Sequence, residues 1–591
     1  MIFPIPKKFV KTEGSYNFKR SYNDSSLPSF YKDCLLADEI KIVHDKELSK
    51  EEYKLTINSD GVLITSSDEE GTFRAVTSLF QLFKRGDGKA PWCSVEDRPD
   101  FERRGYMLDI SRGRMPKKET IKEVIDLLSL LKYNEFQLYM DNFCFKYPLI
   151  PDVTKDIDCL TPEDVKELEE YCKERFVDLV PNQNCFGHME NWLSRDEYKH
   201  LEVGYERGEK TSTINPLHPE TTELVDKIFD SLLPYFSSGY VNIGLDEAGG
   251  LGKYELEEYC NKKGRDVLFM ENLNRIADYI YSNHGKRVQF WADMITGYPN
   301  SFTMIPEGAV ALEWGYEYKD ERKMEKHCRD LKEKGVDFYV CPSCNTHYSL
   351  TGRFETTTAN LRTTAEIGRE FGAKGYLVTD WSCGGEGHPH FAIWSYLPAA
   401  VGAMYAWNVE EEEKELIMET YFDRRARDFL DFFIFGGTQV SERLQRLANY
   451  YLLEPERVRL GTICGMLLWQ DVSVRKHCAY FDLDDCGRDY YFDNVARYVK
   501  EVIDDVKTLD MDERYKREII VNSNMVIFSS LFCKLRMNSE IDKNTAKYLV
   551  ALADEIYEEY KDLWNFRNYE KGMELFLNVI SARKSEIEKY V

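Results

Sequence analysis

From Gly105 to about residue 408 the sequence alternates short apolar segments with amphipathic ones, and this alternation limits the folds open to the chain. The apolar segments read as strands, as in GYMLDI, EFQLYM, DLVPNQ, YVNIGL, VQFWAD, VALEWG, DFYVCP and GYLVTD. The segments between them have helical periodicity, and several open with Pro, Thr or Ser and an early acidic residue, as helix N-termini do. About eight strand–helix units over roughly 300 residues predict a TIM (β/α)8 barrel.

The segments on either side of this region have different patterns. Before it, alternating runs such as YKLTINSDGVLITSS and one helical stretch, GTFRAVTSLFQLFKRG, predict a small α/β domain that ends near the polar SVEDRPDFERRG. After it, segments such as VSERLQRLANYYLLEPERV predict amphipathic helices. We therefore predict an N-terminal α/β domain over residues 1–98, a barrel over 99–408 and a helical domain over 409–591, which contributes to a homodimer interface or to the leaving-group side of the cleft.

Composition restricts the partners and the location. A formal net charge of -25 argues against nucleic acid or an anionic membrane surface as the main partner, because both require clustered Lys and Arg. We find neither an export signal nor an apolar run of about 18 residues. Fifteen scattered cysteines fit reduced thiols better than a disulfide framework, so we expect a cytoplasmic protein without a membrane partner.

Polar and aromatic residues follow the predicted strands at the point where each strand ends. The fourth strand ends in NIGLDEAGG, which places Asp246 and Glu247 side by side. The corresponding residues of the other strands are Asp109, Arg112, Asp141, Asn142, His188, Glu190, Trp291, Asp293, Trp314, His347, Tyr348, Asp380 and Trp381. Because active sites of such barrels lie at the C-terminal ends of the strands, we expect these side chains to converge on one rim.

The chemistry of this rim suits a sugar. Indole rings pack on the C–H faces of a sugar ring while polar groups bind its hydroxyls, and glycoside hydrolysis needs a carboxylic acid beside the scissile oxygen. The alternatives are structural. The tryptophans could be barrel packing, and the acidic pair could be the N-cap and first turn of the next helix.

Three segments resemble glycoside hydrolase family 20, the β-N-acetylhexosaminidases. RRGYMLDISRGRMPKKETIKEVIDLLSLLKYNEFQLYMDN resembles the start of that family's barrel, NIGLDE resembles its acidic-pair motif, and GTFRAVTSLFQLF resembles the end of its small N-terminal domain. The resemblance implies an exo-acting enzyme that releases terminal β-linked GlcNAc or GalNAc with retention and without a cofactor or metal. The substrate's 2-acetamido oxygen would attack to form an oxazolinium, Asp246 would orient the acetamide, and Glu247 would act as general acid and then base.

The resemblance also implies roles for further residues. Arg104 would bind hydroxyls of the terminal sugar, with a surface ion pair as the alternative. His188 is similar to a family histidine, although it could equally be a structural hydrogen-bond partner. Trp291, Trp314 and Trp381 would enclose the N-acetyl group and the sugar ring, with Asp293 beside them.

Three positions depart from the family pattern. Asn242 stands where the motif commonly carries His. The family's tyrosine after the seventh strand is matched by Tyr348, with Tyr316 as a second candidate. Its acidic sugar ligand after the eighth strand could be Glu386, at a shifted spacing in WSCGGEGH.

Other readings of the chain stay open. A retaining glycosidase for a non-acetylated sugar would use Asp246 or another acid as the nucleophile, and a non-catalytic carbohydrate-binding protein would keep the pocket without turnover. Cys341 and Cys344 form a Cys-x-x-Cys near His347 and Cys383, which would allow a zinc or redox site, but we expect simple thiols.

Overall fold

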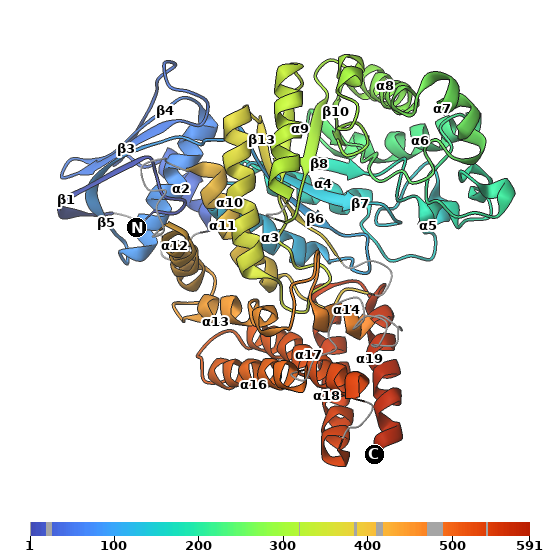
Figure 1. Ribbon diagram of the computed structural model, residues 1–591. Helices are drawn as coiled ribbons and strands as arrows, with labels where there is room; N and C mark the ends of the chain where they lie inside the picture. The colour runs from blue at the N-terminus through green and yellow to red at the C-terminus, as the bar shows by residue number, and fades with distance from the viewer. Residues whose placement is uncertain are drawn as a thin grey trace.

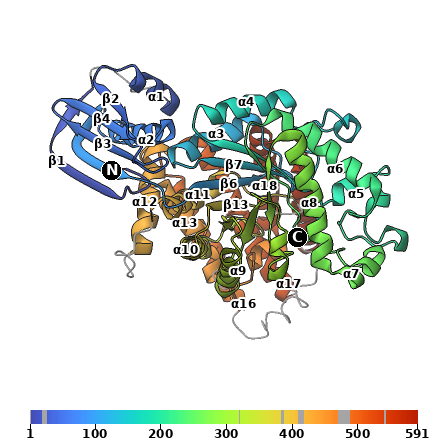
Figure 2. The same ribbon diagram turned by 90° about the horizontal axis from the view of Figure 1, so that it is seen from above.

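The computed structural model describes residues 2–18, 26–317, 320–382, 387–408, 418–469, 488–538 and 542–591. Figure 1 shows a sheet domain at the N-terminal end, a barrel in the middle and a group of helices at the C-terminal end. In the view from above, the N-terminal domain stands beside the barrel on the side away from α6 to α8 (Figure 2). No helix in the described ranges is both long enough and apolar enough to cross a membrane.

The central region is a closed barrel of eight parallel strands, which confirms the predicted TIM barrel. The strands are β6 (Arg103–Asp109), β7 (Glu135–Met140), β8 (Asp178–Gln183), β9 (Tyr240–Asn242), β10 (Arg287–Trp291), β11 (Val310–Trp314), β12 (Phe338–Cys341) and β13 (Gly375–Asp380). Most of their residues are buried, because the interior is packed with side chains and helices cover the outside.

Helices follow most of the barrel strands. The longer ones are α3 (Lys118–Leu130), α4 (Pro162–Lys173), α6 (Pro219–Leu232), α8 (Arg265–His284), α9 (Glu321–Glu333), α10 (Phe354–Phe371) and α11 (Ile393–Trp407), and the short α5 (Glu190–Leu193) and α7 (Glu257–Lys263) lie in loops. The start of α4 shows why these helices begin where they do: Thr161 and Asp164 form a capping box, with Pro162 in the first turn. Between β10 and β11 the chain forms only a 3-10 turn, Pro299–Met304.

The N-terminal domain is a five-stranded sheet in the order β1-β5-β3-β4-β2. Its strands are β1 (Lys8–Asn17), β2 (Ile40–His44), β3 (Tyr53–Asn58), β4 (Gly61–Ser66) and β5 (Lys89–Asp97), and its helices are α1 (Leu27–Leu35) and α2 (Glu69–Arg85). The inward face of α2 packs Phe73, Leu79 and Phe83 against the sheet.

The C-terminal region is helical, as predicted. It contains α12 (Met418–Phe433), α13 (Val440–Leu447), α14 (Ile463–Trp469), α16 (Arg488–Val506), α17 (Glu513–Asn538), α18 (Lys543–Arg567) and α19 (Met573–Ile587). The predicted domain boundaries fall between β5 and β6 and just after α11. These boundaries stay predictions.

Candidate active site

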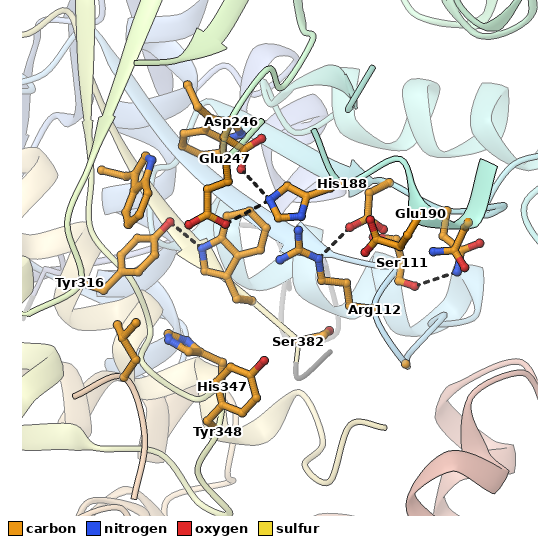
Figure 3. Close-up of a pocket in the computed structure, with 18 of the residues that line it drawn as sticks. Ser111, Arg112, His188, Glu190, Asp246, Glu247, Tyr316, His347, Tyr348 and Ser382 are labelled. Atoms are coloured by element: carbon orange, nitrogen blue, oxygen red, sulfur yellow. Dashed lines mark hydrogen bonds and ion pairs between the residues drawn. The ribbon is translucent and has the colours of Figure 1, made fainter. Parts of the chain in front are cut away.

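A cavity of about 630 Å³ opens at the C-terminal ends of the barrel strands. Each barrel strand contributes residues from its C-terminal end or from the connection that follows it, and two residues come from the C-terminal helical region. Figure 3 shows ten of the lining residues with labels. The lining residues are Ser111, Arg112, Gly113, Asp141, Asn142, His188, Glu190, Asn191, Asp246, Glu247, Trp291, Trp314, Tyr316, His347, Tyr348, Trp381, Ser382, Leu460 and Leu575. Most of the strand-end residues that the sequence singles out thus converge.

The backbone that carries the acidic pair is held in an unusual conformation. After β9 ends, Leu245 and Glu247 have φ angles of 75° and 46°, a region that non-glycine residues seldom adopt. The third connection lies directly against this segment, because a Cβ on Gly187 would be 2.0 Å from the carbonyl oxygen of Asp246. This close approach brings His188 next to the two carboxylates.

His188 contacts both members of the acidic pair. Its Nε2 lies 3.3 Å from Asp246 Oδ2 and 3.2 Å from Glu247 Oε2 (Figure 3). Burial alone would lower the pKa of His188, but its hydrogen bonds to the two carboxylates raise that pKa to about 10. The imidazole is therefore a cation at neutral pH, positioned between two acids.

The two carboxylates differ in their surroundings. Asp246 is buried and also accepts a hydrogen bond from Asn184 Nδ2 at 2.6 Å. Burial would raise the pKa of Asp246, but the hydrogen bond and charge of His188 lower it, so this group is ionised. The side chain of Glu247 is 56% exposed and faces the cavity. One acid is thus a fixed anion, and the other is accessible to a ligand.

Asp293 lies behind the acidic pair instead of in the cavity lining, which corrects its prediction as a substrate-binding residue. Its Oδ2 accepts a hydrogen bond from the backbone N–H of Glu247 at 3.1 Å, which fixes that turn of the chain. Burial, together with the charge of Asp246, raises the pKa of Asp293 to about 7.

The three predicted tryptophans line one wall of the cavity. Trp291 is fully buried, Trp381 donates from Nε1 to the hydroxyl of Tyr316 at 2.8 Å, and Trp314 stacks on Tyr316 with ring centroids 5.0 Å apart. Tyr316 is thus part of the aromatic wall, whereas Tyr348 is 39% exposed. Both candidate tyrosines reach the cavity, and their roles stay predictions.

Arg112, and not Arg104, is the arginine of the cavity. Its Nε donates to Asp141 Oδ2 at 2.7 Å, and its guanidinium lies 5.0 Å from the ring of Trp381. Arg104 is the second residue of β6, at the opposite end of the barrel. There it is buried and donates to Glu51 of the N-terminal domain at 2.5 Å, so the predicted contact with sugar hydroxyls is wrong. The direction of the strand could have identified Arg112 from the sequence, because Arg112 follows the C-terminal end of the strand, where the active sites of such barrels lie.

The remaining predicted groups have simple outcomes. Glu386 and Cys383 lie outside the described residues. Cys341 and Cys344 are buried free thiols, and burial raises the pKa of each well above its usual value, which disfavours the thiolate that a metal needs. The donor atoms of His188, Asp246 and Glu247 lie within 4.8 Å of one another, which is close enough for all three to bind one metal ion. The expectation that the site works without a metal therefore stays a prediction.

Some lining residues were not anticipated from the sequence. Leu460 and Leu575 come from the C-terminal region and have no chemical signature. Ser111, Asn191 and Ser382 are each within three residues of a predicted strand-end residue, which is the only sequence signal for them.

The fold and the site together are those of a TIM-barrel glycoside hydrolase, with an acidic pair and an aromatic wall in one cavity. Residues 101–360 match the family model described as the glycosyl hydrolase family 20 catalytic domain, and residues 7–98 match the same family's domain 2. The chain belongs to glycosyl hydrolase family 20. Residues after 360 lie outside both models.

Known relatives are similar over part of the chain. A β-hexosaminidase of Akkermansia muciniphila is 26% identical over an alignment of 255 residues that covers 38% of this chain and 50% of the relative. The β-hexosaminidase α subunit of Bos taurus is 26% identical over an alignment of 292 residues that covers 45% of this chain and 53% of the relative. The matches therefore span about half the length of these curated relatives.

Solved structures share the fold over more of the chain. A β-N-acetylhexosaminidase from Bacteroides fragilis superposes with a TM-score of 0.59 at 20% identity, covering 73% of this chain and 95% of that one. A chitobiase from Flavobacterium johnsoniae superposes with a TM-score of 0.60 at 16% identity, covering 98% of both.

Proposed function

We propose that this protein is an exo-acting β-N-acetylhexosaminidase that releases terminal β-linked GlcNAc or GalNAc by retaining, substrate-assisted hydrolysis. The observation that carries the proposal is the pairing of a buried, ionised Asp246 with a solvent-accessible Glu247 in a cavity walled by indole rings. Several relatives bear the name β-hexosaminidase, and another is named N,N'-diacetylchitobiase, which supports this assignment.

The first step forms a cyclic intermediate. The oxygen of the substrate's 2-acetamido group attacks the anomeric carbon, and the bond to the leaving oxygen breaks as Glu247 gives that oxygen a proton. Asp246, held by Asn184 and His188, accepts the acetamide N–H and balances the positive charge of the oxazolinium. Fixed charge placed where charge develops lowers the barrier without reorganisation.

The second step restores the acetamide. Water attacks the anomeric carbon, Glu247 takes a proton from it, and the bond from carbon to the acetamido oxygen breaks. Two displacements at one carbon retain its configuration. Arg112, paired with Asp141, would bind sugar hydroxyls, and the aromatic wall of Trp291, Trp314 and Trp381 would exclude bulk water from the acetamide.

The test is hydrolysis of 4-nitrophenyl β-GlcNAc and β-GalNAc, with and without a thiazoline mimic of the oxazolinium. We expect turnover that the mimic blocks. Glu247→Gln should lower kcat by about 10²- to 10⁴-fold, the usual contribution of a general acid. Glu206→Gln, an exposed substitution away from the cavity, is the matched control.

Other outcomes would favour the alternatives. Turnover insensitive to the thiazoline would favour direct attack by a carboxylate on a non-acetylated sugar. Sugar binding without turnover in the folded wild-type protein would favour a carbohydrate-binding role.

We also propose a cytoplasmic location, which is supported by the twelve free cysteines of the described residues. Cell fractionation tests it. The homodimer stays a prediction that light scattering of the purified protein will test.

A further inference from the structure

The C-terminal helical region reaches the active-site cavity at the start of α19. Leu575, in the first turn of this helix, lines the cavity and is 42% exposed. This region lies outside both family models.

The barrel order places this part of the cavity wall opposite the acidic pair. A Cβ on Gly387, in the connection after β13, would lie 3.0 Å from Leu575 Cβ and 2.6 Å from Phe576 N, so α19 rests directly on that connection. In the closed ring of eight strands, β13 is four strands away from β9, which precedes Asp246 and Glu247. The connection on which Leu575 rests is therefore on the opposite side of the barrel from the acidic pair.

Main-chain contacts fix the turn between α18 and α19 to the first barrel connection. The N–H of Tyr569 donates to Met115 O at 2.9 Å, and the N–H of Lys117 donates to Arg567 O at 2.9 Å. A Cβ on Gly572 would lie 2.6 Å from Gly113 O, next to Arg112. The turn is thus packed against the connection that carries the cavity's arginine.

A buried ion pair joins α17 to α18, and a side-chain hydrogen bond joins α17 to the barrel. Arg567 Nε lies 2.6 Å from Glu518 Oε1, and both side chains are almost fully buried. Asn522 of α17 donates to Pro389 O at 2.6 Å, which ties the eighth connection to the same helices. The start of α19 is therefore held firmly against the barrel at the edge of the cavity.

We propose that the α18–α19 turn closes the cavity at the edge of the sugar away from the scissile bond, with Leu575 as the specificity-determining residue. The leaving group must depart on the side of Glu247, so a sugar ring in the cavity presents its opposite edge to Leu575. An apolar side chain there borders any substituent on that edge and offers it no hydrogen bond. The ligand class is a terminal N-acetylhexosamine without a substituent on the edge facing α19. This inference rests on the proposed function.

The experiment compares 4-nitrophenyl β-GlcNAc with its 3-O-, 4-O- and 6-O-methyl ethers in the full-length protein. We expect the wild type to hydrolyse the parent compound and to discriminate against at least one ether. In Leu575→Ala the kcat/KM of that ether relative to the parent should rise about tenfold, and in Leu575→Trp it should fall further. Leu36→Ala, at a leucine that is 76% exposed in the N-terminal domain, should leave the ratio unchanged.

Two failures are distinguishable. If the folded wild type does not hydrolyse the parent compound, the proposed function fails. If the parent is hydrolysed but the ratios of all three ethers stay within twofold of wild type in both Leu575 variants, the wall does not set specificity and the inference is overturned. Thermal unfolding of each variant shows whether a changed ratio comes from a folded protein.

Discussion

Replacing Arg104 by Met should mainly lower stability, and replacing Arg112 by Met should mainly lower catalysis. Arg104 is 1% exposed, donates to Glu51 and gives further hydrogen bonds to Lys132 O at 3.0 Å and Phe101 O at 2.9 Å. Removing one partner of a buried ion pair costs about 3 to 5 kcal/mol. Arg74 also pairs with Glu51, at 2.7 Å, so Glu51 keeps one cation and we expect about 3 kcal/mol, the lower end of that range.

Arg112→Met should affect the reaction, and because it leaves the buried Asp141 without its ion-pair partner it should also cost stability. Arg112 lines the cavity, and a hydrogen bond to a charged group contributes about 1.5 to 3 kcal/mol. Loss of one such bond to the substrate corresponds to a decrease in kcat/KM of roughly 10- to 150-fold. Denaturant unfolding and Michaelis–Menten kinetics on 4-nitrophenyl β-GlcNAc, measured for both variants, separate the two effects.

The result that would refute this reasoning is specific. If Arg104→Met unfolds like the wild type and raises KM, its side chain reaches substrate and the placement of the two arginines is wrong. Arg104→Lys, which keeps the charge but not the planar fork, should recover only part of the lost stability.

Two further predictions concern the support of the acidic pair. Because the pKa of Asp293 is raised from 3.8 to about 7, the unfolded chain loses this proton first as pH rises, and the contribution of Asp293 to stability should fall between about pH 4 and 7. The free energy of unfolding of Asp293→Asn, relative to that of the wild type, should therefore rise between about pH 4 and 7. Denaturant unfolding at a series of pH values measures this difference. A difference that does not change with pH would contradict the raised pKa of Asp293. Gly187→Ala should lower kcat/KM about 100-fold, because its Cβ would meet the carbonyl oxygen of Asp246. Gly239→Ala, with open space around its Cβ, is the control, and equal kinetics of the two variants would argue against the close approach.

The fold could be predicted because each barrel strand is a short buried run followed by polar residues. That pattern predicts both the position of each strand and its direction. It therefore predicts that His188, the acidic pair and the three tryptophans lie at the same end of the barrel, as they do. Arg104 was misplaced because a motif resemblance was used without the strand direction, which puts the second residue of β6 at the far end of the barrel.

The contribution of the C-terminal region could not be predicted. Leu460 and Leu575 are apolar residues in a sequence of helical periodicity, and such residues usually form the core. The docking of α19 on the barrel brings Leu575 to the cavity, whereas Leu460 reaches it from a turn in which its backbone N–H donates to Glu317. Likewise, the position of Asp293 behind Glu247 depends on a side-chain-to-backbone hydrogen bond that has no sequence pattern.

The left-handed backbone at Leu245 and Glu247 has a consequence for engineering this chain. For residues other than glycine this conformation costs roughly 1 to 2 kcal/mol, so a search for thermostable variants will find favourable changes to Gly or Asn at the exposed Glu247. At Leu245 the loss of a fully buried side chain outweighs that gain. Glu247 carries the proposed acid, and Leu245 sets the path of the chain that leads to it. Selection for heat resistance alone will therefore favour the loss of turnover, and a screen of this protein should measure both properties in the same clone.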